Sequence, residues 1–101
     1  MSSGNGQPRQ YSLSMSKFQQ GRLLELHHQQ DSLGRGHRFL FAYREVIRRL
    51  ERDPRIFGEH LFNLTTLNLE IRQAAIHPLV VDYGVHEEKN IVFIQGFKVL
   101  G

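Results

Sequence analysis

The spacing of apolar residues changes along the chain, from alternation to a helical period and back to alternation. Tyr11-Ser12-Leu13-Ser14-Met15 alternates apolar and polar residues, which predicts a short half-buried strand. The preceding residues 1–10 are rich in Ser, Gly, Asn and Pro and have few apolar side chains to bury, so we expect a tail without fixed structure there. The folded domain is therefore expected to cover residues 11–101.

Two helices are expected after this strand. Ser16 can cap a helix that runs towards Asp31, and Gly34-Arg35-Gly36 can end it and turn the chain. From His37 to Asp53 apolar residues recur at steps of three and four, which predicts a second helix. Pro54 disfavours helical geometry at Asp53 and should end it. The two helices should form an antiparallel hairpin.

The last third of the chain returns to strand-like patterns. Leu67–Arg72 alternates strictly, and Leu79–Val85 and Ile91–Phe97 are rich in β-branched and aromatic residues, which predicts three strands. The polar residues His86–Asn90 should join the last two strands as a hairpin. We expect an α+β fold in which an N-terminal strand and a helical hairpin pack on one face of an antiparallel C-terminal sheet. Apolar residues after the second helix should close the edge of the core, and these are Phe57, Leu61 and Phe62. The exposed apolar residues near them are also where a partner's helix or strand would dock.

Period-two alternation also predicts the two faces of this sheet. The face towards the helices should carry Leu69, Ile71, Leu79, Val81, Tyr83, Val85, Ile91, Phe93 and Phe97. The opposite face should present Glu70, Arg72, Asp82, Gly84, His86, Gly96 and Lys98 over a floor of Val80, Val92 and Ile94. This second face is thus expected to be open, shallow and polar.

Composition bounds the class of protein. A chain of 101 residues with 40% hydrophobic and 23% charged residues fits one small globular domain. It has no cysteine, which excludes disulfides and thiolate chemistry, and no apolar run near the roughly 20 residues of a membrane span. We expect a soluble, cytoplasmic protein without a membrane role. The six histidines lack the spacing of metal ligands, so neither a metal site nor a cofactor is expected.

Positive charge is concentrated in one segment. The formal net charge is +3, yet residues 35–55 hold seven arginines against three acidic residues. Arginines clustered on one helix are typical of a surface that binds nucleic acid. The alternative is a solvated helix face with local ion pairs. The candidate nucleic-acid-binding residues are Arg38, Arg44, Arg48, Arg49 and Arg52.

The expected polar face offers groups for phosphate chemistry. Arg72 could bind a phosphate in bidentate fashion, and Lys98 supplies a compact cation. Glu70, Asp82 or His86 could transfer a proton. Structural roles compete with each of these: Arg72 could pair with a carboxylate across strands, Lys98 could protect a sheet edge, and His86 could be an idle turn residue.

The order of these elements resembles the RelE/ParE superfamily of type II toxins over roughly Tyr11–Leu100. The second helix ending Val46-Ile47-Arg48-Arg49-Leu50-Glu51-Arg52-Asp53-Pro54 carries the resemblance, together with the strands Leu69-Glu70-Ile71-Arg72, Val80-Val81-Asp82-Tyr83-Gly84-Val85 and Ile91-Val92-Phe93-Ile94. The resemblance implies a small toxin with an antitoxin partner, which either cleaves messenger RNA on the ribosome without a metal or acts on DNA gyrase. It also implies that Arg72 lies next to the scissile phosphate.

The chain departs from the family pattern in two places. It ends at Lys98-Val99-Leu100-Gly101 without the family's late tyrosine or histidine, and Ile76-His77-Pro78 replaces a small loop followed by an arginine. Three hypotheses follow. The first is a ribosome-dependent endoribonuclease, and the second is a non-catalytic binding module of the same fold that contacts gyrase or only an antitoxin. The third is a domain of this fold that makes simple nucleic-acid or protein contacts without a toxin role.

Overall fold

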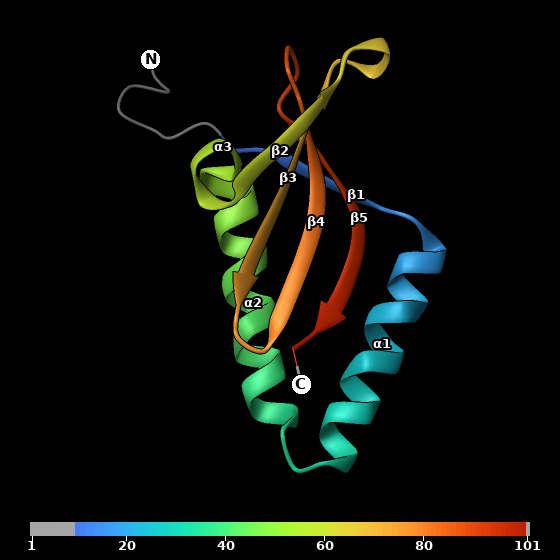
Figure 1. Cartoon of the computed structure of the whole chain (residues 1–101). Helices are drawn as coiled ribbons and strands as arrows, with labels where there is room; N and C mark the ends of the chain where they lie inside the picture. Colours follow the sequence, from blue (N-terminus) through green and yellow to red (C-terminus); the bar gives the residue numbers. More distant parts are fainter. Residues whose placement is uncertain (1–9, 101) are drawn as a thin grey trace.

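A five-stranded mixed sheet runs through the molecule, and two long helices lie along it (Figure 1). The computed structural model describes residues 10–100, so the tail expected over residues 1–10 lies, except for Gln10, outside the described residues. The strand order in the sheet is β1-β5-β4-β3-β2. The strands are β1 (Ser12–Met15), β2 (Glu59–Leu64), β3 (Leu69–Ile76), β4 (Leu79–His86) and β5 (Ile91–Val99). The α+β class is confirmed.

The helices begin and end close to the expected positions. Helix α1 (Lys17–Ser32) follows Ser16, whose hydroxyl oxygen accepts the backbone N–H of Gln19 at 3.1 Å. Gly34, in the left-handed region at φ 75°, turns the chain into α2 (Gly36–Arg52). A short helix α3 (Pro54–Phe57) follows, and Pro54 occupies its first position. The break at Pro54 is therefore confirmed.

The sheet differs from the expected antiparallel meander. Strand β1 pairs with β5 in the parallel direction, so the sheet is mixed. Strand β2 was not expected; it pairs with β3 at the edge of the sheet, and a 3-10 turn, η1 (Thr65–Leu67), joins them. Leu61 and Phe62 lie in β2 and are exposed, so the prediction that they close the core is wrong, whereas Phe57 does pack against the core.

The core lies between the sheet and the helices. α2 contributes Phe39, Ala42, Val46 and Leu50, and α1 contributes Leu26. The sheet contributes Ala74, Leu79, Val81, Tyr83, Val85, Val92, Ile94 and Phe97. The expected orientation of β4 is confirmed, because Val81, Tyr83 and Val85 are fully buried in this cluster.

The predicted faces of β3 and of the first half of β5 are wrong. Arg72 is paired with Tyr83 across the strands and Ile71 with Gly84, so Glu70 and Arg72 share the helix side with Tyr83. In β5 the pairing shifts between Ile94 and Gly96, and this bulge brings Ile94 and Phe97 to the same side. Val92 and Ile94 therefore face the helices, whereas Leu69, Ile71, Ile91 and Phe93 lie on the open face.

Candidate functional site

The five residues predicted to form a catalytic site divide between the two faces of the sheet. Glu70 and Arg72 lie on the helix side, because Arg72 is the cross-strand neighbour of Tyr83. Asp82, His86 and Lys98 lie on the open face, in register with residues of that face. The predicted site therefore does not assemble.

Arg72 is held in a structural network rather than presented to solvent. Its side chain is only 11% exposed, and its Nη2 donates a hydrogen bond to the Gly58 carbonyl oxygen. Its Nη1 lies 3.3 Å from Glu70 Oε1, which also lies 3.6 Å from Arg55 Nη1. Arg55 in turn donates to the carbonyl oxygen of His86 at 2.7 Å. The cluster ties α3 to β3 and to the β4–β5 hairpin.

Tyr83 anchors the same region. Its hydroxyl donates to the Pro54 carbonyl oxygen at 2.8 Å, and its ring stacks against Phe57 with the centroids 6.5 Å apart. Burial raises the pKa of Tyr83, while the Gly58 backbone and Arg72 act in the opposite direction. The hydroxyl therefore stays protonated and donates at neutral pH.

Two of the three remaining candidates, Asp82 and His86, have local partners on the open face. Asp82 Oδ1 accepts a hydrogen bond from Gln73 Nε2 at 2.7 Å. His86 Nδ1 accepts the backbone N–H groups of Glu88 and Lys89, each at 3.1 Å. A neutral His86 must therefore hold its proton on Nε2, and Nδ1 is already occupied as an acceptor. Lys98 is exposed and projects from β5.

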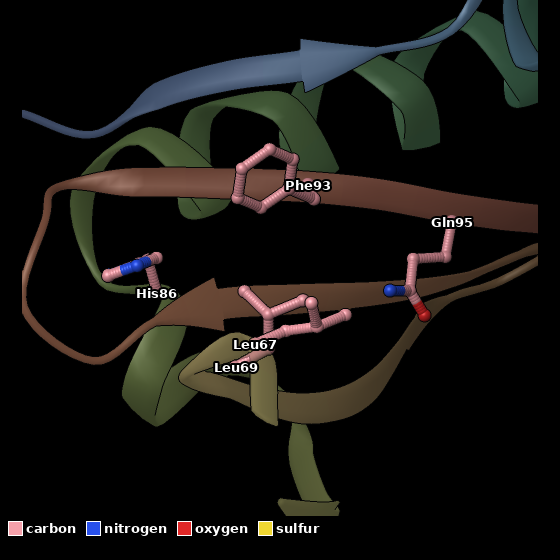
Figure 2. Close-up of a pocket in the computed structure, with 5 residues that line it drawn as sticks. All are labelled: Leu67, Leu69, His86, Phe93 and Gln95. Carbon is pink, nitrogen blue, oxygen red and sulfur yellow. The ribbon is translucent and has the colours of Figure 1, made fainter. Parts of the chain in front are cut away.

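A shallow apolar pocket occupies the open face instead of the expected polar surface. Its volume is about 330 Å³, and it is lined by Leu67, Leu69, His86, Phe93 and Gln95. Figure 2 shows that the lining residues come from β5, from the end of β4, and from the segment where η1 leads into β3. Of the predicted site residues, only His86 lines this pocket.

Gly84 has no Cβ, which leaves room for the neighbouring side chains beside the pocket. A Cβ at position 84 would lie 3.1 Å from Ile71 Cδ1 and 3.4 Å from Leu69 Cδ1, so these side chains lie over the glycine. Leu67 is 59% exposed and Phe62 in β2 is 49% exposed. The open face thus continues as an apolar surface from β5 to the edge strand. The alternation of Leu67, Leu69 and Ile71 was the signal for it, but that signal was assigned to the helix side.

The predicted nucleic-acid-binding arginines lie in two different environments on α2. Arg48 bonds to Glu45, which lowers the pKa of that carboxyl, and Arg49 Nε donates to Asp53 Oδ1 at 3.0 Å. The guanidinium of Arg49 also lies 4.7 Å from the centroid of the Phe57 ring. The other members, Arg38, Arg44 and Arg52, are exposed, and no carboxylate of residues 10–100 pairs with them within 4 Å.

Other kinds of site are not formed within the part of the chain that the structure describes. Residues 10–100 contain no group of three or more histidine and acidic side chains close enough to hold a metal ion. None of the helices in this range is long and apolar enough to cross a membrane.

Comparison with protein-family models, with curated proteins and with solved structures finds no match for this chain. A function can therefore be proposed only from the resemblance in the sequence and from the geometry of the two surfaces.

Proposed function

We propose that this chain is a toxin-like component of a type II toxin-antitoxin system that acts as a non-catalytic binding module. In this proposal, a cytoplasmic antitoxin protein covers the open face of the sheet. The observation that carries the proposal is the apolar pocket lined by Leu67, Leu69 and Phe93, which forms where phosphate chemistry would need charge.

The elements that carry the RelE/ParE resemblance support the toxin-like assignment. The N-terminal strand, the helix pair, the break at Asp53-Pro54 and the strands β3 to β5 are all formed in the expected order. The parallel pairing of β1 with β5 brings the two ends of the domain together in one sheet. This is support for a RelE/ParE-like fold, which we adopt as part of the proposal.

The endoribonuclease hypothesis has less support. Cleavage of messenger RNA on the ribosome needs a cation and an acid or base around one phosphate. Arg72 and Glu70 are separated from Asp82, His86 and Lys98 by the sheet itself, and Arg72 already bonds to Gly58. Gyrase remains the alternative target of a non-catalytic toxin, and the open face is equally suited to a protein target of that kind.

The open face also indicates what the partner offers. Apolar side chains of a partner segment would fill the pocket beside Phe93, and His86 would donate one hydrogen bond from Nε2 to a carbonyl of that segment. A pocket with a mainly apolar lining and one oriented donor is typical of peptide recognition rather than of phosphate binding.

The test is co-expression of this chain with the reading frame next to its gene, followed by purification and native mass spectrometry. We expect a stable complex with the intact chain and its loss in Phe93→Asp and Leu67→Asp, which place a charge in the pocket. Ile56→Asp is the matched control, because Ile56 is 77% exposed but lies outside the pocket lining.

RNA from the same cultures separates the binding module from the endoribonuclease. If the chain is a binding module, induction without the partner leaves the 5′ ends of translated messages unchanged. New 5′ ends that appear with the intact chain and disappear in Lys98→Ala and Asp82→Asn, two changes away from the helix core, would contradict the proposal and support the endoribonuclease.

A further inference from the structure

The outer side of α2 combines positive charge with an exposed aromatic ring. α2 carries five arginines and two glutamates, a net charge of +3 that equals the formal net charge of the whole chain. Phe41 lies on the same helix and is 69% exposed. The buried apolar face of α2 consists of other residues, which are Phe39, Ala42, Val46 and Leu50. Burial in the core therefore does not explain Phe41.

Helical spacing places Phe41 among the arginines. Residues three and four positions apart are neighbours on a helix, so Phe41 lies between Arg38 and Arg44. Arg44, Arg48 and Arg52 follow at intervals of four residues and continue along the same side over about 12 Å of helix axis. We call Arg38, Phe41, Arg44, Arg48 and Arg52 the α2 outer surface.

Local ion pairs do not neutralise this surface. Glu45 bonds to Arg48, which leaves that pair with no net charge. Arg38, Arg44 and Arg52 are exposed and have no carboxylate partner within 4 Å among residues 10–100. The other acidic residues near them are Glu51, and Asp53 at the end of the helix, which pairs with Arg49. Three positive charges therefore remain available on the side of α2 that carries Phe41.

We propose that the α2 outer surface binds single-stranded nucleic acid. An unpaired base stacks on the ring of Phe41, Arg38 and Arg44 contact the flanking phosphates, and Arg52 contacts a phosphate further along the strand. Single-strand binders combine a positive track for the backbone with aromatic side chains for the bases, which is the chemistry found here. A duplex keeps its bases stacked inside and would leave Phe41 unused, so the exposed ring favours a single strand.

The proposal is independent of the antitoxin hypothesis, because the two surfaces lie on opposite sides of the sheet. The pocket opens on the face away from the helices, and α2 covers the other face. Both can be occupied at once. The pocket variant Phe93→Asp should therefore bind nucleic acid as the intact chain does, so failure of one proposal leaves the other unaffected.

The first experiment measures fluorescence anisotropy of labelled oligonucleotides roughly 15 nucleotides long, as single-stranded DNA, single-stranded RNA and the matching duplexes, at about 50 mM salt. We expect Phe41→Ala to weaken single-strand binding about 5- to 150-fold, the loss expected for one stacked base. Phe18→Ala is the matched control, because Phe18 is an exposed phenylalanine on α1, and it should change nothing.

The second experiment measures the salt dependence of binding. Each phosphate contact contributes about 0.7 to the slope of log affinity against log salt for single strands, so Arg44→Ala with Arg52→Ala should lower the slope by about 1.4. The control with the same change in charge is Arg22→Ala with Lys89→Ala, which lie on α1 and in the β4–β5 turn. Arg44 and Arg52 are both exposed and alanine favours the helical conformation, so the fold should persist in this variant.

Three results would overturn the proposal. The first is no binding to either single strand at low salt. The second is an equal loss in the α2 variants and in their controls, which would indicate binding through total charge alone. The third is a duplex or a polyglutamate competitor that binds as tightly as the single strand, together with single-strand binding that Phe41→Ala leaves unchanged. The comparison of DNA with RNA then identifies which single strand the surface prefers.

Discussion

Both faces of the sheet carry buried apolar residues, but these are covered in different ways. On the helix side, Val81, Tyr83 and Val85 are fully buried beneath α1 and α2. On the open side, Leu69 and Ile71 are buried by their neighbours around Gly84, while Leu67 remains largely exposed at the pocket. The comparison shows that an apolar residue in or beside the sheet can be buried or left exposed, and that the elements covering it decide which.

The largest expected effect tests this difference directly. Leu50→Ala removes a fully buried side chain from the helix side and should lower the free energy of unfolding by about 2–5 kcal/mol. Leu67→Ala makes the same chemical change at the pocket and should alter it by less than about 0.5 kcal/mol. Urea denaturation measures both. Equal losses would mean that the open face is part of the core.

A smaller effect is expected at Gly58, where the helix side is tightly packed. A Cβ there would lie 2.6 Å from the Tyr83 hydroxyl and 2.7 Å from the Gln73 carbonyl oxygen. Gly58→Ala should therefore destabilise by about 1–3 kcal/mol through overpacking. Gly96→Ala is the control, because its nearest atom, Asp82 Oδ2, would be 3.7 Å away. Equal thermal unfolding temperatures for the two variants would contradict the close packing of Gly58 against Tyr83 and Gln73.

Tyr83→Phe should cost about 1 kcal/mol, because the Pro54 carbonyl loses its hydrogen-bond donor. Burial raises the pKa of Tyr83, so the folded state holds this proton more tightly than the unfolded state. Its contribution is fully present below about pH 10 and is lost as the pH rises from there through the folded pKa.

Urea denaturation between neutral and alkaline pH checks the sign of this effect. Burial also raises the pKa of Tyr43, so Tyr43→Phe serves as the comparison and the double variant should lose both contributions. A wild-type stability that increases above pH 10 would contradict the assignment.

The smallest effect is expected at the His86 turn on the open face. His86→Ala removes the acceptor of two backbone N–H groups at an exposed site and should cost about 0.5–1 kcal/mol. His86→Asn should restore most of it, because an asparagine oxygen can accept from the residue two positions on. Amide hydrogen exchange of Glu88 and Lys89 provides the readout: protection should fall in the alanine variant and return in the asparagine variant.

Much of the fold was predictable because local signals agree with it. The cap at Ser16, the three-and-four spacing along α2, the break at Pro54 and the polar link between β4 and β5 all correspond to formed elements. Strand β2 was missed, because Leu61 and Phe62 have apolar side chains that the structure leaves exposed at a sheet edge. An apolar pair next to a helix break is ambiguous between a core plug and an edge strand.

The candidate site was predictable only in part. Of the predicted site residues, His86 lines the pocket, whereas Arg72 lies on the opposite face of the sheet from Asp82 and Lys98, with which the sequence grouped it. Leu67, Phe93 and Gln95 were not predicted as lining residues. Leu67 was expected in a strand and Phe93 on the face towards the helices, and Gln95 belongs to no motif in the sequence. The error comes from the phase of two strands rather than from the choice of residues.

The sequence by itself determined most of the helices and strands, because caps, helix breaks and periodic apolar residues act over a few neighbouring positions. The short helix α3 and the edge strand β2 are the exceptions. Only the tertiary structure decided which side of each strand faces the helices. A period of two defines two faces but does not say which is covered. That choice depends on hydrogen bonds between distant residues: Arg72 opposite Tyr83, the bulge at Ile94–Gly96, and β1 beside β5.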